Sequence, residues 1–493
     1  MNTRTKKSFV INEPLLKDMD NAGCKGFTLK QLDVPLDHDK SIPGHLLRKD
    51  RPKIPSLSEI QVVRHFTRLS KHNYSIEDGI FPLGSCTMKY NPKINSDIAG
   101  LQGFTKLHPY SSPESSQGSL QAMYELRSAL MHITGLADCS LMPNAGAHGE
   151  LVGMKLIKAY FESKNEERKT VLIPDTAHGT NPSSAHLAGF RAKEIKSSKS
   201  GYLFVETIEK YLSDDIAGLM VTNPNTLGIF ERDIKKIADL LHKNDSLLYI
   251  DGANLNALLG RARFSDMGAD VVHLNLHKTF STPHGGGGPG AGPVCVSERL
   301  RPFLPVPNVS YDRERDAYYL DYNYPASIGR VRAFYGNFAV LVRALVYIKM
   351  LGETGLKNAS GIATLNANYI KKRLQDYYFL PYDQDTLHEV VFSHKLQKDK
   401  GVRVSDIAKM IIDRGFHPPT ISFPLVVHGA LMIEPTETES REELDGFINA
   451  MIEIAKEIDI NPESAQDAPR NAPAKRLDEV QAAKTPVLTW NYL

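Results

Sequence analysis

The chain of 493 residues is 41% hydrophobic and 24% charged, which is enough apolar material for a large core divided among about two or three domains. Its 59 lysines and arginines nearly balance 57 aspartates and glutamates, so the net charge of +2 gives no electrostatic reason to expect nucleic acid or an anionic membrane as the main partner. This balance favours a globular protein that acts on small molecules.

The sequence shows no sign of secretion or membrane insertion. Its basic N-terminus lacks an apolar stretch long enough for a signal peptide, and nowhere are about 18 consecutive residues apolar. The four cysteines, Cys24, Cys86, Cys139 and Cys295, lie far apart and form no Cys-x-x-Cys pair, which excludes a zinc ribbon or a disulfide framework. We expect a protein of the reducing cytoplasm.

Residues 1–78 are predicted to form an N-terminal arm. Four prolines between residues 35 and 55 interrupt short periodic pieces there, and a further periodic piece follows at residues 59–69. We expect such a loop-rich segment to lie on another surface.

Residues 79–335 are predicted to form a large domain built on a mostly parallel sheet. Apolar strand-like runs alternate with helical patterns, which is typical of an α/β fold. The strand candidates are residues 170–174, 217–222, 246–250 and 270–276, and a helix is predicted over residues 231–243. In open α/β sheets the ligand lies beyond the carboxyl ends of the strands, so the polar residues just after each run are candidate site residues.

The remainder of the chain changes character. Residues 336–460, with a long apolar helix over 338–351 and further helices near 403–414 and 441–458, predict a smaller α+β domain. Residues 461–493 form a tail whose apolar end contains Trp490, the only tryptophan, and we expect this end to dock on a surface.

Lys278 is the strongest candidate for chemistry. It ends the run His273-Leu-Asn-Leu-His-Lys278 and precedes the glycines 285–288. Strand periodicity would place His273, Asn275 and His277 on one face, and the glycines let a backbone approach a ligand closely. An arbitrary lysine is usually a solvated surface residue, but this context indicates an amine in a cleft. The glycine run has neither a dinucleotide nor a P-loop spacing, which disfavours NAD and ATP.

Asp251 closes another predicted strand. An aspartate in this place can keep a pyridine nitrogen protonated, which lets the ring accept electrons from a carbanion. The alternative is a cap for the helix that follows. Ala253, two residues on, is small enough to lie against a flat ring.

Three further polar clusters end a strand or open a helix. His178 could stack on a planar cofactor or move protons, with a buried structural histidine as an equal alternative. Gly146, Ala147 and His148 open a helical pattern whose free N–H groups suit a phosphate, and Thr226 lies in a polar stretch after residue 222. The stretch at Gly146 and the one that contains Thr226 could each also be an ordinary turn. Together the five clusters predict a site for pyridoxal phosphate.

Several longer motifs occur together in this chain. They are Leu83-Gly-Ser-Cys-Thr-Met-Lys89, His108-Pro-Tyr-Ser, Asn144-Ala-Gly-Ala-His-Gly-Glu150, Asp175-Thr-Ala-His-Gly-Thr-Asn181 and the segment from His273 to Gly290. This set resembles glycine decarboxylase, the P-protein of the glycine cleavage system. The resemblance covers about residues 60 to 460 and corresponds to the C-terminal half of the single-chain form, or to subunit 2 of the split form.

The resemblance implies a fold-type I pyridoxal-phosphate enzyme, similar to aspartate aminotransferase. It implies that Lys278 is the Schiff-base lysine, that Asp251 pairs with the pyridinium and that His178 stacks on the ring. It also implies that the phosphate is held by Gly146, Ala147 and His148, with Asn275 and His277 as helpers beside the lysine.

The same resemblance implies the reaction and the partners. Glycine would lose its carboxylate as carbon dioxide, and the aminomethyl group would pass to the lipoyl disulfide of the H-protein. Because single-chain members are about twice as long, a separate subunit 1 is expected, in an α2β2 assembly with the arm and the tail as wrapping segments.

Three other readings remain open at this point. A cysteine desulfurase or aminotransferase would share the lysine, aspartate and histidine, and Cys86 would be the nucleophile of a desulfurase. A metal-dependent hydrolase would use His273, His277 and Asp251, although His-Glu-x-x-His is absent and Lys278 would have no role. The third is a noncatalytic scaffold that has kept the fold, and the intact lysine, aspartate and histidine argue against it. The group that binds the glycine carboxylate is not evident, with Arg330 and Arg332 as guesses.

Overall fold

The computed structural model describes residues 13–20, 23–24, 26–28, 30–31, 33–34, 41–50, 54–285, 290–472 and 474–488. The chain divides into two compact units, Met1–Asp78 with Pro469–Leu493, and Gly79–Ala468. The predicted docking of Trp490 and the glycines 286–288 lie outside the described residues. The finer predicted domain limits at residues 335 and 460 stay predictions. None of the described helices has the length and apolar character needed to cross a membrane.

The smaller unit contains the helix α2 (Glu59–Ser70). Ser58 and Gln61 cap its start reciprocally, since each side chain accepts the backbone N–H of the other. On one side of the helix His65 is buried, and its Nδ1 lies 3.0 Å from Glu13 Oε1. The segment with periodic apolar residues at 59–69 is therefore a helix, and its buried His65 is held by Glu13.

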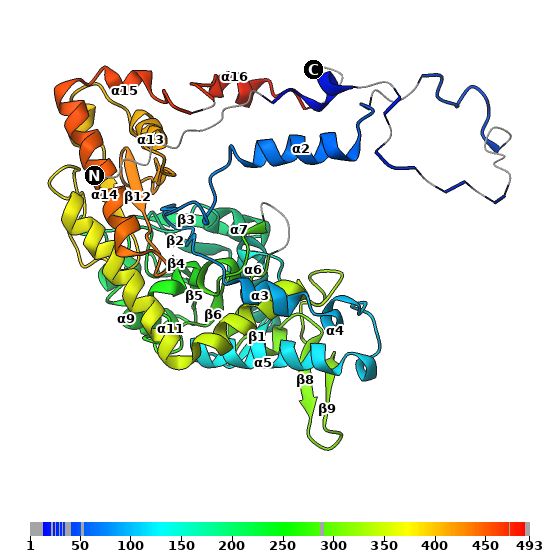
Figure 1. The fold of residues 1–493 in the computed structure, drawn as a ribbon. Helices are drawn as coiled ribbons and strands as arrows, with labels where there is room; N and C mark the ends of the chain where they lie inside the picture. The colour runs from blue at the N-terminus through cyan, green and yellow to red at the C-terminus, as the bar shows by residue number, and fades with distance from the viewer. Residues whose placement is uncertain are drawn as a thin grey trace. The chain divides into compact units, whose positions relative to one another are not determined.

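The larger unit is built on a seven-stranded sheet (Figure 1). Its strands are β1 (Asp138–Ser140), β2 (Thr170–Pro174), β3 (Arg191–Ile195), β4 (Ile216–Thr222), β5 (Leu247–Asp251), β6 (Val271–His273) and β7 (Val294–Val296). The spatial order is β1-β7-β6-β5-β4-β2-β3, with β3, β2, β4, β5 and β6 parallel and β7 antiparallel to both of its neighbours. The predicted mostly parallel sheet is confirmed.

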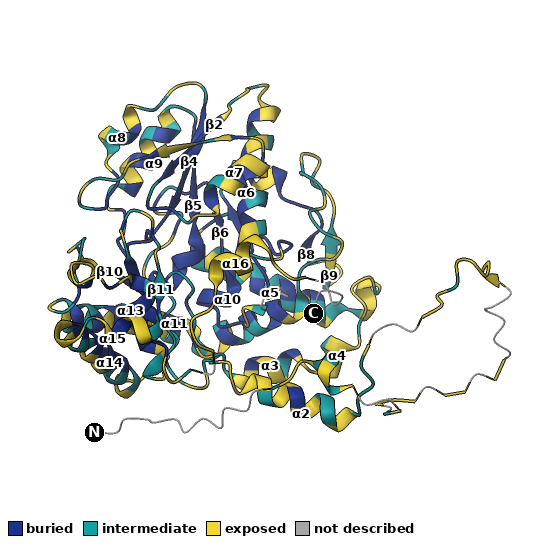
Figure 2. Cartoon of the chain, turned by 90° about the horizontal axis from the view of Figure 1, so that it is seen from above, coloured by how far each residue is buried: buried dark blue, intermediate teal, exposed yellow. Residues whose placement is uncertain are grey.

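Helices cover both faces of this sheet. The helices of this part are α3 (Lys93–Ala99), α4 (Gln102–Thr105), α5 (Gln117–Thr134), α6 (Gly146–Ser163), α7 (Asn181–Leu187), α8 (Val205–Glu209), α9 (Ile234–Lys243) and α10 (Leu276–Thr279). Along β5, Leu247 and Tyr249 pack in one core with α6, whereas Leu248 and Ile250 pack in the other with α5 and α9. Figure 2 shows the resulting pattern, with the central strands buried and the outer helix faces exposed.

One strand prediction was partly wrong. The run predicted at residues 270–276 is extended only as far as His273, after which α10 begins at Leu276. His273 pairs with Val294, and the next partner along is Pro293, which has no N–H for a regular ladder. The prediction that His273 and His277 share one face of a strand is therefore wrong, because His277 lies in α10.

A smaller three-stranded sheet follows in the chain. Its strands are β10 (Val390–Ser393), β11 (Thr420–Ile421) and β12 (Ala430–Ile433), and its helices include α12 (Lys395–Lys398), α13 (Val404–Asp413), α14 (Arg441–Ile460) and α15 (Ser464–Asp467). Along the chain, β8 (Asn308–Asp312) and β9 (Ala317–Asp321) come after the large sheet and before the small one. They form a hairpin that projects from the large sheet in Figure 1. The predicted α+β part is confirmed as a separate small sheet with helices.

The helix α11 (Phe338–Leu374) connects the two sheets. It is interrupted at Gly352, whose φ of 60° and ψ of −175° are accessible essentially to glycine alone. Before this residue Leu341 packs in the core of the large sheet, and after it Ile370 packs in the core of the small sheet. The helix predicted to end at residue 351 is thus the first of two segments.

Candidate active site

The carboxyl ends of the parallel strands bring several predicted site residues together. Asp251 ends β5, and its register partners are Thr222 at the end of β4 and His273 at the end of β6. His178 follows β2 and donates its backbone N–H to Thr222 Oγ1 at 3.1 Å. Lys278 lies in α10, directly after β6.

Asp251 is fully buried and accepts hydrogen bonds on both carboxylate oxygens. Its Oδ2 lies 2.6 Å from His178 Nδ1 and accepts Asn181 Nδ2 at 3.1 Å, while its Oδ1 lies 3.2 Å from His273 Nε2. Burial opposes ionisation, but His178, His273 and the hydrogen bonds outweigh it and hold the pKa of Asp251 well below its usual range. The side chain is therefore a carboxylate at neutral pH.

Asp251 also caps the short helix that follows it. Its Oδ1 accepts the backbone N–H of Ala253 at 2.9 Å, at the start of the 3-10 helix Gly252–Ala257. The two sequence interpretations of this aspartate, as a cap and as a partner for a ligand, are compatible. Ala253 is buried immediately beside it.

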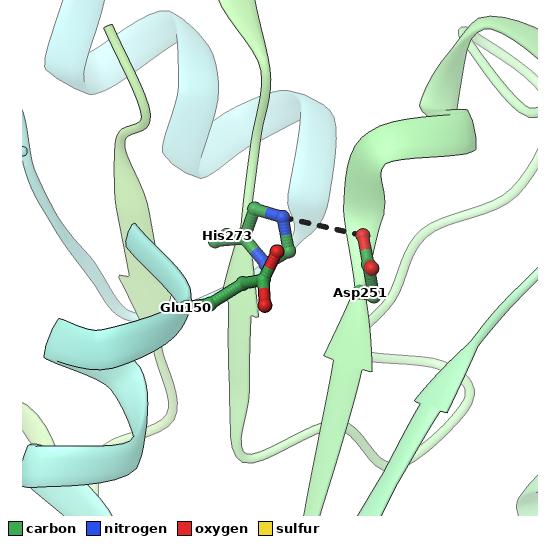
Figure 3. A group of neighbouring side chains, drawn as sticks. All are labelled: Glu150, Asp251 and His273. Carbon is green, nitrogen blue, oxygen red and sulfur yellow. Dashed lines mark ion pairs between the residues drawn. The ribbon is translucent and has the colours of Figure 1, made fainter. Parts of the chain in front are cut away.

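Glu150, Asp251 and His273 form a close group, drawn in Figure 3. Their ligating atoms all lie within 4.8 Å of one another, a spacing that could suit a metal ion. The chain's own groups engage them, however: Glu150 accepts Thr180 Oγ1 at 2.8 Å, and His273 Nδ1 lies 2.8 Å from the Tyr249 hydroxyl. We interpret the group as a hydrogen-bond network that holds Asp251.

Lys278 is nearly buried, with 9% of its surface exposed. Within the described residues its Nζ forms no hydrogen bond. Beside it, burial, His284 and Lys278 lower the pKa of His277 to about 3, and burial and Lys278 lower the pKa of His284 to about 4. Both imidazoles, whose rings meet edge to face, are therefore neutral around the amine.

The start of α6 has the features of an anion site. Ala145 before it provides no side-chain cap, and a Cβ on Gly146 would meet Asn275 Oδ1 at 2.0 Å. That Asn275 oxygen is buried and has no hydrogen-bond partner among the described residues. Asn144 N donates to His148 Nδ1 at 3.1 Å, and burial with Arg332 and Lys155 nearby lowers the pKa of His148. Uncapped N–H groups and a close backbone approach suit a phosphate.

Two predicted residues have contacts of a different kind. Thr226 is fully buried, and its hydroxyl and backbone N–H both donate to the carbonyl oxygen of Thr176, at 2.8 and 3.1 Å. Arg330 is exposed and packs over Tyr322. Arg332 is half-buried, both terminal nitrogens lying 3.3 Å from Asn337 Oδ1, and its charge acts on His148 at the start of α6. The roles guessed for these residues stay predictions.

The structure adds residues that had not been predicted as site residues. Ser85 Oγ lies 2.6 Å from His178 Nε2. The buried Glu389, just before β10, accepts the backbone N–H of Ser85, and the buried Glu434, just after β12, accepts that of Thr87. Burial raises the pKa of Glu389 well above its usual range, and burial, Lys278 and His178 lower the pKa of His388 to about 3. The motif Leu83-Gly-Ser-Cys-Thr-Met-Lys89 was the one available signal.

Comparison with known proteins first shows to which class of fold this chain belongs. The family model of class-V aminotransferases matches residues 149–415, and the C-terminal domain of glycine dehydrogenase matches residues 359–475. A crystal structure of glycine decarboxylase (P-protein) in inhibitor-bound form superposes with a TM-score of 0.70, covering 85% of this chain and 93% of that chain at 18% identity. A cysteine desulfurase from Thermococcus onnurineus NA1 gives a TM-score of 0.60, covering 77% and 95% at 16% identity. The fold is that of the fold-type I, class-V aminotransferase family.

Sequence similarity then defines the family within this class. The chain is 55% identical to a probable glycine dehydrogenase (decarboxylating) subunit 2 from Caldanaerobacter subterraneus subsp. tengcongensis, over 97% of this chain and 98% of the relative. It is 53% identical to the corresponding protein of Pyrococcus furiosus, over 97% and 96%. The chain belongs to the family of glycine dehydrogenase (decarboxylating) subunit 2. The resemblance noted in the sequence is confirmed.

Proposed function

We propose that this chain binds pyridoxal phosphate at Lys278 and decarboxylates glycine in the cytoplasm, passing the aminomethyl group to the lipoyl group of the H-protein. The observation that carries the proposal is a group at one edge of the sheet: a lysine amine without a hydrogen bond among the described residues, an ionised buried aspartate and an uncapped helix start. Membership of the glycine dehydrogenase subunit 2 family supports the same reaction.

The residues of the site fit this cofactor at each of its polar ends. Gly146, Ala147 and His148 at the start of α6 would hold the phosphate. Asp251 would hold the positive charge of the ring nitrogen, because its pKa is held low. Lys278 would form the covalent attachment. When bound, pyridoxal phosphate supplies an electron sink for the charge left on the glycine carbon.

The chain's own contribution to the reaction is binding, charge placement and the exclusion of water. The carbon–carbon bond of glycine breaks to release carbon dioxide, a carbon–sulfur bond forms as the lipoyl disulfide opens, and one proton goes to the second sulfur. Asp251 and Lys278 are buried or nearly so, which keeps water from the charged groups. His178, between Asp251 and Ser85, would lie against the ring.

The proposed partner is a separate subunit 1, in an α2β2 assembly. The helix α2 supports this partner, because four apolar side chains spaced three residues apart along it are exposed: Ile60 by 52%, Val63 by 53%, Phe66 by 53% and Leu69 by 36%. An amphipathic helix with an uncovered apolar side is an interaction surface in need of a partner. The proline-rich arm that contains it would wrap around subunit 1.

The experiment is isotope exchange between labelled bicarbonate and glycine, with lipoylated H-protein present. We expect exchange when this chain is combined with subunit 1 of a split glycine dehydrogenase, and little or none from this chain alone. H-protein without its lipoyl group is the matched control. Full activity from this chain alone would contradict the paired-subunit proposal, and no exchange in any combination would contradict the reaction.

A further inference from the structure

Residues 83–89, here called the strap, lie against the small sheet. Leu83 forms an isolated bridge with Ile433, and Gly84 donates its N–H to the carbonyl oxygen of Met432 at 3.1 Å. A Cβ on Gly84 would meet the Met432 side chain at 2.2 Å, so the contact requires glycine. The strap is thereby fixed to β12.

Two residues of the strap hold conformations that non-glycine residues rarely adopt. Ser85 has a φ of 62° and Thr87 a φ of 47°. Each is held by a buried carboxyl that flanks a strand of the small sheet, since Ser85 N donates to Glu389 Oε2 at 2.7 Å and Thr87 N donates to Glu434 Oε2 at 2.8 Å. Strained backbone of this kind persists where the surroundings enforce it, often at functional sites.

In this conformation the Ser85 side chain contacts His178, which follows β2 of the large sheet. Its Oγ lies 2.6 Å from His178 Nε2, and His178 Nδ1 lies 2.6 Å from Asp251 Oδ2. Because the Asp251 carboxylate is an acceptor, Nδ1 carries the proton of this pair. In a neutral imidazole Nε2 is then an acceptor, which matches the hydroxyl of Ser85 as a donor.

We propose that Ser85 is a positioning residue for His178: its hydroxyl donates to Nε2 and, together with Asp251 on Nδ1, fixes the orientation of the ring, and Glu389 holds Ser85 in place. The outer partners that orient metal-binding histidines through the second nitrogen change function by about 10-fold to 100-fold when removed, and we expect an effect of the same order here. The inference concerns the site of the proposed function and rests on it for its effect on turnover. Its effect on the histidine does not depend on that function.

The first test observes the hydrogen bond at His178 Nε2 in the full chain without cofactor, by long-range proton–nitrogen magnetic resonance on isotope-labelled histidine. The His178 signals are assigned by their loss in His178→Asn. In the neutral ring we expect the Nδ1–H form in both the wild type and Ser85→Ala, because Asp251 accepts that proton, and we expect the Nε2 signal of Ser85→Ala to shift to that of a nitrogen that has lost a hydrogen bond. Ser85→Gly, which removes the hydroxyl but suits the left-handed backbone, should show the same shift and stay folded.

The matched control is Thr87→Val, which removes a hydroxyl from the same strap but one bonded to Glu434. It should leave the His178 signals unchanged. Turnover with subunit 1 and H-protein should fall about 10-fold to 100-fold in Ser85→Ala and recover in Ser85→Thr. Wild-type His178 signals in Ser85→Ala and Ser85→Gly, or an equal shift in Thr87→Val, would overturn the inference. Failure of glycine turnover in the wild type would instead count against the proposed function.

Discussion

Lys89 Nζ donates a hydrogen bond to the carbonyl oxygen of Thr279 at 2.7 Å, and Thr279 is the residue directly after Lys278. The same buried ammonium pairs with Glu437 at 2.7 Å and donates to Tyr347 at 3.0 Å. One lysine therefore fixes the backbone that carries the other. Lys89 is saturated by its partners, which leaves the Lys278 amine as the group available for covalent chemistry.

Lys278→Ala is expected to abolish covalent attachment of pyridoxal phosphate and glycine turnover, because the nearby Lys89 amine is held by Glu437, Tyr347 and the Thr279 carbonyl and cannot replace it. The measurement is the visible absorbance of the reconstituted protein, followed by borohydride reduction and mass spectrometry of the modified peptide. Lys210→Ala, an exposed lysine after α8, is the control and should retain both signals. If Lys278→Ala kept the visible absorbance, the assignment would be wrong.

Gly146→Ala is expected to weaken cofactor binding about tenfold or more, which corresponds to about 1.4 kcal/mol. The added Cβ would lie 2.0 Å from Asn275 Oδ1, so the asparagine or the helix start must move. Cofactor titration followed by fluorescence measures the dissociation constant. Gly118→Ala in α5, where a Cβ meets nothing within 4 Å, should bind the cofactor normally. Equal affinities for the two variants would contradict this reading of the α6 start.

Glu231 is expected to make stability depend on pH. Burial raises its pKa to about 7 from 4.5, although Leu203 N and Asn225 Nδ2 donate to it. Because the folded state holds the proton more tightly, the associated stability is present below pH 4.5 and is lost as the pH rises through 7, by about 3 kcal/mol. Glu231→Gln should lack this loss when urea unfolding is measured at pH 4.5, 6 and 8.

The exposed Glu206→Gln in α8 is the control for this measurement and should follow the wild-type pH dependence. The decisive quantity is the difference in unfolding free energy between wild type and Glu231→Gln. A difference that stays constant across the three pH values would show that Glu231 titrates normally in the folded state.

The four thiols are expected to react in two groups. Cys139 and Cys295 are fully buried partners across β1 and β7, and burial together with Cys295 raises the pKa of Cys139 well above its usual range. Cys24 and Cys86 are partly exposed. An aromatic disulfide reagent should therefore modify Cys24 and, more slowly, Cys86 in the native protein, since burial also raises the pKa of Cys86. Modification of Cys139 or Cys295 before unfolding would refute this.

Val63→Asp on the exposed apolar side of α2 is expected to weaken association with subunit 1 about tenfold or more, because a charge would be buried in the interface. Arg64→Ala, at the neighbouring exposed position, is the control. Affinity is measured by titrating subunit 1 in analytical ultracentrifugation. Thermal unfolding of the isolated chain should be the same for both variants, and unaltered binding by Val63→Asp would remove α2 from the interface.

The sequence allowed the central sheet to be predicted because β2, β4 and β5 are buried on both faces and read as apolar runs. It did not reveal β3, in which only Ile195 is buried, so that no apolar run marks it. It did not show that the helix after residue 338 resumes beyond Gly352, because a glycine in that conformation interrupts the periodicity.

Much of the candidate site was predictable for a related reason. Asp251 and Thr222 end parallel strands and His178 follows another, and the ends of such strands meet at one edge whatever the loops between them. Ser85 and Glu389 could not be placed, since their meeting depends on how the small sheet packs beside the large one. The predicted face shared by His273 and His277 failed where α10 replaced the end of the strand.

The position of β7 in the large sheet also determines the order in which the chain can fold. β7 lies between β1 and β6, so β1, which ends at Ser140, has no partner until Val294–Val296 has been made. The parallel strands β2 to β6 can associate as each leaves the ribosome, whereas the earliest strand is the last to be paired. Contacts of such long sequence separation form slowly. A nascent chain stalled before residue 294 would therefore leave β1 without its partner strand, and the shortness of β1, three residues, limits the edge that it would expose.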